Sequence, residues 1–165
     1  FFNDVLCFNG DSEPEFEYLK YKNKIVINYE DDPKNNDLHK LNLDKKFDFI
    51  MLNQTLEHLY DPISVLKSVF NSLNNEGIFY CNVPAINIPH MTPLHYYSGF
   101  TPTGLGCLVQ HCGFEILDIG FWGNKEYTLK MFNDNNIFLC TFFYAFVSTI
   151  NNIRILIEDV EKFNW

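Results

Sequence analysis

The sequence predicts an α/β fold: a Rossmann-like, mostly parallel sheet with helices on both faces and an antiparallel strand near the carboxyl terminus. Three observations lead to this prediction. Short apolar segments alternate with amphipathic ones, two predicted helices begin with a capping residue followed by proline, and no repeat or flexible linker divides the chain. With 165 residues, 47% of them hydrophobic, we expect one domain over 1–165. The chain begins with Phe1 and not with Met, which is consistent with a missing segment before it.

Four short apolar segments predict the strands of the parallel part of the sheet. They lie at 4–8, 24–28, 47–52 and 78–83. The second of them is apolar on both faces, as strands buried between two layers of helices are. A turn dipeptide, Asn9-Gly10, follows the first segment and indicates where that strand ends.

Two helices are predicted by their first residues. Asp61-Pro62 and Thr101-Pro102 each combine an N-cap residue with proline at the first helical position, and apolar residues follow at helical spacing. Gly113 indicates the end of the second helix. The other elements that we expect are a short helix from Ser12, an edge strand near 37–41, strands at 114–119 and 139–148, and helices at 124–132 and 152–163.

Charge and composition exclude several kinds of partner. The net charge is −9, from 21 acidic and 12 basic residues, so the chain lacks the positive surface that nucleic acids or anionic membranes require. The longest apolar run, 137–150, is too short to span a bilayer. The five cysteines are scattered and include no C-x-x-C pair, which is typical of reduced thiols and predicts a cytoplasmic protein.

Polar residues follow each predicted parallel strand. In open α/β sheets, ligands bind beyond the carboxyl ends of the strands. The residues expected at that edge are Asn9, Gly10, Asn28, Glu30, Asp37, Asn53 and Gln54, with the segment from Pro84 onward.

Several motifs in order resemble those of class I S-adenosylmethionine-dependent methyltransferases, in particular a compact branch of types 11 and 23. Phe47-Asp48-Phe49-Ile50, Leu56-Glu57-His58-Leu59 and Asp61-Pro62 are similar to the region of that family's fourth strand. Further similarities are Leu73–Pro84, His95, Phe100-Thr101 and Gly113-Phe114, so that the resemblance covers about 24–121.

The resemblance implies a cofactor, S-adenosylmethionine, and a role for each residue at the strand ends. Glu30, or Asn28 in its place, would bind the ribose hydroxyls, and Asp37 would face the adenine amino group. Leu38 is a further residue expected to bind the cofactor. Asn53 and Gln54 would border the methionine part, and Asn9-Gly10 would form the turn against the cofactor. Each role has an alternative. Glu30 would then belong to a solvated acidic loop, Asp37 would be a turn residue, and Asn53 and Gln54 would be a polar strand end.

One motif departs from the family. Its glycine-rich turn after the first strand corresponds here to Cys7-Phe8-Asn9-Gly10-Asp11-Ser12, which keeps one glycine and has Cys7 in place of the leading acid. The chain is therefore either a compact methyltransferase or a non-catalytic, methyltransferase-like binding protein. A nicotinamide dehydrogenase is disfavoured because no G-x-G-x-x-G follows a strand.

Methyl transfer depends on positioning and the exclusion of water more than on acid–base groups. His90 and His95 are our candidates for taking a proton from a small-molecule acceptor, and the alternative is that they only pack the loop. We expect His58 to have a structural role more than a catalytic one. Cys107, His111 and Cys112 offer no fourth ligand, so we predict no metal site. The sequence leaves the acceptor and the oligomeric state open.

Overall fold

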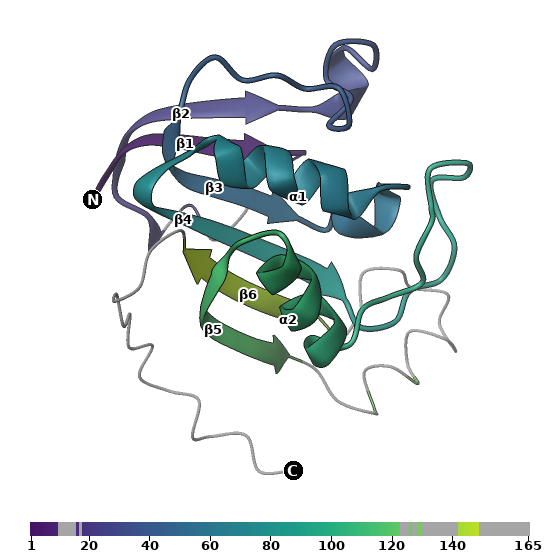
Figure 1. Ribbon diagram of the computed structural model, residues 1–165. Coiled ribbons are helices and arrows are strands. Elements are labelled where there is room, and N and C mark those ends of the chain that lie inside the picture. Colours follow the sequence, from purple (N-terminus) through teal and green to yellow (C-terminus); the bar gives the residue numbers. More distant parts are fainter. Residues whose placement is uncertain (10–15, 17, 123–125, 127–128, 130–141, 149–165) are drawn as a thin grey trace.

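The computed structural model of the chain describes residues 1–9, 16, 18–122, 126, 129 and 142–148 (Figure 1). The helices expected from Ser12, at 124–132 and at 152–163 fall largely or wholly outside these residues. No helix in the described ranges is long and apolar enough to cross a membrane.

Within the described residues, six strands form one sheet in the order β2-β1-β3-β4-β6-β5. The pairs β2–β1, β1–β3 and β3–β4 are parallel, whereas β6 is antiparallel to both of its neighbours. The predicted Rossmann-like, mostly parallel sheet with an antiparallel strand near the carboxyl terminus is therefore confirmed. The strands are β1 (Phe2–Phe8), β2 (Tyr21–Ile27), β3 (Phe47–Asn53), β4 (Leu73–Pro84), β5 (Glu115–Trp122) and β6 (Phe142–Ser148).

Two α-helices, α1 (Pro62–Asn71) and α2 (Pro102–His111), lie on the same face of the sheet (Figure 1). Both begin as predicted: the Asp61 side chain accepts a hydrogen bond from the Ser64 amide, and Thr101 accepts one from the Gly104 amide. Their buried side chains, Leu66 of α1 among them, join the larger core cluster with β1, β3 and β4. A smaller cluster covers the opposite face of those strands.

The edge strand predicted near 37–41 is wrong, because the structure has turns there. The Asp37 carboxylate accepts a hydrogen bond from the His39 amide, and the Lys40 amide donates to the Asp37 carbonyl. Such a local side-chain bond competes with strand pairing, and the sequence pattern of apolar residues does not reveal it. In the described residues the sheet thus ends at β2. The chain after β2 lies at the carboxyl end of the strands as far as about residue 39 and then runs back to the start of β3 (Figure 1).

Candidate active site

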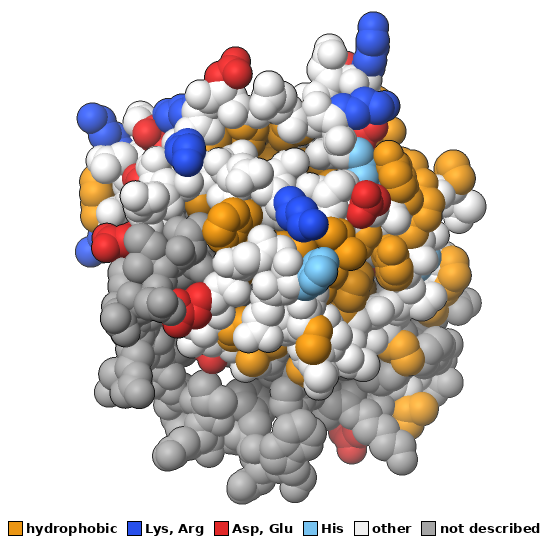
Figure 2. All heavy atoms as spheres, viewed as in Figure 1, with side chains coloured by type: hydrophobic (Ala, Val, Ile, Leu, Met, Phe, Trp, Pro, Cys, Tyr) orange, Lys and Arg blue, Asp and Glu red, His pale blue; other side chains and the backbone are white. Residues whose placement is uncertain are grey.

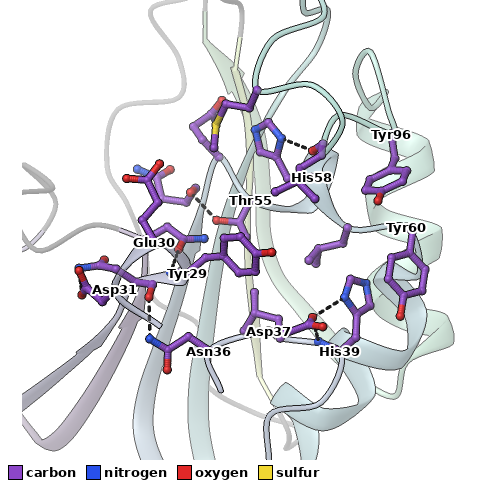
Figure 3. Close-up of a pocket in the computed structure, with 18 residues that line it drawn as sticks. Tyr29, Glu30, Asp31, Asn36, Asp37, His39, Thr55, His58, Tyr60 and Tyr96 are labelled. Carbon is purple, nitrogen blue, oxygen red and sulfur yellow. Dashed lines mark hydrogen bonds and ion pairs between the residues drawn. The ribbon is translucent and has the colours of Figure 1, made fainter. Parts of the chain in front are cut away.

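A cavity of about 470 Å³ lies at the carboxyl edge of the parallel strands (Figure 3). Its walls come from the end of β1, the segment after β2 that includes the short helix η2 (Tyr29–Asp31), the segment after β3 that includes the short helix η3 (Leu56–His58), and the loop after β4. The lining residues are Asn9, 28–31, 36–39, 53–55, 58–60, Met91, Leu94 and Tyr96.

Sequence reasoning named eight residues for the ligand site, and the structure brings seven of them to this cavity. The eighth, Gly10, lies outside the described residues. Their convergence follows from the parallel sheet, in which all carboxyl ends meet at one edge. Their individual roles stay predictions. The seven are Asn9, Asn28, Glu30, Asp37, Leu38, Asn53 and Gln54.

Two of these residues adopt a left-handed backbone conformation. Asn9 has φ of 58° and Gln54 has φ of 47°. Asn9 also joins the ends of β1 and β2, since its amide donates to the Ile27 carbonyl at 3.0 Å and its Oδ1 accepts from the Tyr29 amide at 2.9 Å. Asparagine tolerates this conformation better than most residues, which lets Asn9 make a turn that glycine would otherwise make.

Asp37 is held by its own loop. Its Oδ1 lies 2.9 Å from His39 Nδ1 and its Oδ2 lies 3.0 Å from Lys40 Nζ. Burial alone would raise the pKa of Asp37, but the hydrogen bonds from Lys40 and His39 outweigh burial and lower the pKa. On its other side His39 Nε2 accepts from the Asp61 amide at 3.3 Å, so Asp37 also connects the loop to the start of α1.

Asn28 and Glu30 differ in how they are held. Asn28 donates from Nδ2 to Asp31 Oδ2 at 3.0 Å, and its carbonyl accepts from Asn36 Nδ2 at 2.7 Å. Glu30 is exposed at the mouth of the cavity. Figure 3 shows Glu30 and Asp31 across the cavity from His39 and the two tyrosines discussed next.

An aromatic wall, formed by His39, Tyr60 and Tyr96, closes one side of the cavity (Figure 3). The rings of His39 and Tyr60 are stacked with centroids 3.7 Å apart, and the rings of Tyr60 and Tyr96 meet edge to face at 5.9 Å. Sequence reasoning missed this wall. In the sequence, Tyr60 follows a predicted strand and Tyr96 lies in the loop after another. Aromatic residues at such positions are too common to predict a binding site.

The two histidines predicted as proton acceptors, His90 and His95, lie behind the cavity wall and do not line the cavity. They pack against His58, which does line it. The centroid of the His58 ring lies 4.8 Å from that of the His90 ring and 5.6 Å from that of the His95 ring. Burial lowers the pKa of His58 and of His95, so both imidazoles are neutral near pH 7. The structure thus makes His58, read from the sequence as structural, the member of the group that reaches a ligand.

Glu57 is a buried acid beside this group. Its side chain is 1% exposed, and burial raises its pKa to about 7. Its Oε1 lies 3.9 Å from His58 Nε2, and its Oε2 has no hydrogen-bond partner. Its backbone carbonyl accepts from the amides of Tyr96 and Tyr97, which fixes the loop after β4 against η3.

Apolar side chains surround the opening. They gather at the side of Figure 2 that corresponds to the carboxyl ends of the strands in Figure 1. Tyr60, Met91 and Tyr96 of the cavity are 57%, 52% and 45% exposed. Exposed apolar groups around a cavity are typical of a binding surface for an organic molecule.

The sequence model of a family described as "Methyltransferase domain" matches residues 9–118, more than half of the chain. No curated protein matches the sequence. Among solved structures, an S-adenosylmethionine-dependent methyltransferase from Clostridium acetobutylicum aligns with 92% of this chain and 85% of its own, at 14% identity and a TM-score of 0.62.

Two further structures were solved with S-adenosylhomocysteine bound. The N-methyltransferase NodS of Bradyrhizobium japonicum aligns with 91% of this chain and 79% of its own at 12% identity, with a TM-score of 0.62. The 1,6-didemethyltoxoflavin-N1-methyltransferase of Burkholderia thailandensis, which also holds its acceptor, aligns with 90% of this chain and 71% of its own at 13% identity, with a TM-score of 0.62. At such identities these likenesses show the shared fold.

Proposed function

Because the chain belongs to the methyltransferase domain family, we propose that it transfers a methyl group from S-adenosylmethionine to a small organic acceptor in the cavity at the carboxyl edge of the sheet. The single observation that carries the proposal is that seven of the residues which the sequence predicts for the cofactor line one cavity. Its volume falls within the roughly 300–1,000 Å³ of small-molecule sites.

We assign the residues at the strand ends to the parts of the cofactor. Glu30, an exposed acid after β2, is the group that we assign to the ribose hydroxyls, with Asn28 beside it. Asp37 and the buried Leu38 are assigned to the adenine, and Asn53 and Gln54 to the methionine part. When bound, the cofactor supplies an electrophilic methyl group on a sulfonium centre.

The chain contributes position and shielding more than acid–base chemistry. The aromatic wall of His39, Tyr60 and Tyr96 offers faces that attract cations and planar rings. His58 lies where an acceptor hydroxyl or amine would enter, and a neutral imidazole is able to take a proton from it. The exposed apolar rim favours an apolar or aromatic acceptor over nucleic acid, as does the net charge of −9. The cytoplasmic location stays a prediction from the cysteines.

A second candidate is a non-catalytic binding protein with this fold. It is favoured by Asn9 at a left-handed position where the family has glycine, and by the Asp37 carboxylate, which the loop already engages. Both features predict that cofactor binding is weaker than a full glycine loop would allow.

Calorimetric titration with S-adenosylhomocysteine tests the proposal. We expect saturable binding at one equivalent, weakened by about 10- to 100-fold in Glu30→Ala, as for the loss of a charge-assisted hydrogen bond. Asp44→Ala is the matched control, since Asp44 is an exposed acid of the same loop region that does not line the cavity. No binding by the parent chain would favour the non-catalytic candidate. Binding that Glu30→Ala leaves unchanged would contradict the assignment of Glu30.

A further inference from the structure

Three histidines that are distant in the sequence come together at the cavity wall. His58 ends the short helix η3 after β3, whereas His90 and His95 belong to the loop after β4. One ring nitrogen from each of the three lies within 4.8 Å of the others. The rings of His90 and His95 are 4.8 Å apart, so each ring contacts the other two. We call these residues the histidine cluster.

Backbone carbonyls fix the proton on two of the rings. His58 Nδ1 lies 2.7 Å from the Leu94 carbonyl, and His90 Nδ1 lies 2.9 Å from the Ile88 carbonyl. A carbonyl only accepts hydrogen bonds, so in both residues Nδ1 carries the proton and donates it. The lone pair is therefore on Nε2. This arrangement, a backbone carbonyl on one nitrogen and a free lone pair on the other, is the usual state of a histidine that binds a metal.

The third ring has no satisfied nitrogen. Both nitrogens of His95 are buried and neither has a hydrogen-bond partner. Leaving a buried polar group unpaired is unfavourable, and packing of the rings alone does not explain why His95 is left in this state. Glu57 adds a second unpaired group, because its buried Oε2 also lacks a partner beside His58.

An ion at the centre of the cluster would bind one nitrogen of each ring, including one of the unpaired nitrogens of His95. Three imidazoles with a neighbouring carboxylate match the ligands that zinc prefers. In a tetrahedral zinc site the ligand nitrogens are about 3.4 Å apart, given Zn–N distances of about 2.1 Å. From separations of at most 4.8 Å, the three nitrogens would need to move closer by at most about 1.4 Å to bind one ion.

We propose that Nε2 of His58, Nε2 of His90 and one ring nitrogen of His95 bind a divalent transition-metal ion of the zinc class, with Glu57 as the adjacent carboxylate. Since His58 also lines the cavity, the ion would lie directly behind the acceptor side of the pocket. This role excludes the role of the same histidines as proton acceptors, because a metal-bound nitrogen has no lone pair left. The proposal does not depend on the cofactor, and it would replace the proton-accepting role given to His58 above.

Titration of the metal-free chain with Co²⁺, followed by visible absorption, tests the site without any activity assay. We expect the intense bands of tetrahedral Co²⁺ to saturate at one equivalent, and Zn²⁺ to displace the Co²⁺. His90→Ala and His95→Ala should each weaken Co²⁺ binding by at least 10-fold. His111→Ala is the control, because His111 is exposed on α2 away from the cluster and its loss should change nothing.

Two results would overturn the proposal: a parent chain without saturable Co²⁺ absorption, and a saturable site that both His90→Ala and His95→Ala leave intact. If these variants do not fold, nitrogen-15 spectra of the parent imidazoles decide the question. Zn²⁺ should then shift the ring signals of His58, His90 and His95 and leave those of His39 and His111 in place. Equal shifts for all five, or none, would equally refute the site.

Discussion

The carboxylate of Asp37 joins parts of the cavity wall that no regular element connects. It accepts from the amide and the ring of His39 and pairs with Lys40, and through His39 it reaches the amide of Asp61 at the start of α1. From the sequence, Asp37 reads as a ligand contact or a turn residue. The structure shows that the turn role is real, so that a substitution here changes the stability of the chain as well as its binding.

Asp37→Asn should lower the free energy of unfolding by about 1–2 kcal/mol at neutral pH, since hydrogen bonds to a charged acceptor are lost. The pKa of Asp37 is lowered in the folded chain, so this stabilisation is complete above the unfolded value near 3.8 and is lost as the pH falls through the folded pKa. Urea denaturation between pH 7 and pH 3 should show the two proteins converging at acid pH. A constant difference would contradict the role of the charge, and Asp44→Asn should match the parent throughout.

At the level of elements, the loop from 85 to 100 forms the far wall of the cavity and carries two members of the histidine cluster. It is tied to η3 by the Glu57 carbonyl, which accepts from two of its amides, and by the His58 ring on the Leu94 carbonyl. Its end returns to β4, where the Phe100 amide donates to the Pro84 carbonyl at 2.9 Å. The position of His90 and His95 therefore depends on the closure of this loop.

Gly99→Ala tests that closure. Gly99 has φ of 152°, and a Cβ atom there would collide with the backbone of Ala85. We expect a loss of about 1–3 kcal/mol in unfolding free energy, the range for a strained backbone position, together with weaker ligand binding. Gly106→Ala, within α2, is the control. Its new Cβ would lie at ordinary contact distance from Ile116 and Ile119 of β5. Because alanine favours a helix more than glycine does, that variant should be as stable as the parent or slightly more stable. Equal stability of the two variants would show that the loop is not closed in this way.

On the scale of the whole molecule, the sequence predicts what local and periodic signals determine. The strands β1, β3 and β4 follow from apolar segments, and both helix starts follow from Asp61 and Thr101 with their prolines. The carboxyl ends of the parallel strands share one edge of the sheet. For this reason the sequence predicts that residues as separate as Asn9, Glu30 and Asn53 lie at one site, and all three line the cavity.

What the sequence could not predict depends on contacts between distant segments. Nothing in the spacing of His58, His90 and His95 indicates a cluster, because the loop that carries two of them is placed by backbone bonds to Glu57. The aromatic wall is missed for the same reason. The wrong edge strand near 37–41 is different: there a local side-chain bond of Asp37 outweighs the apolar pattern.

The arrangement of the fold separates its stable part from its binding part, and hydrogen exchange should make this visible. β1, β3 and β4 lie inside the sheet, with fully buried residues such as Leu6, Ile50 and Phe79, so their amides should exchange only on global unfolding. The amides of 28–46 and 85–100 should exchange faster, through local opening. S-adenosylhomocysteine at 100 times its dissociation constant should slow them by up to about 100-fold. Amides of the central strands should also slow, because the bound ligand stabilises the whole folded chain against global unfolding. Slowing confined to other regions would place the ligand away from this cavity, whatever its measured affinity.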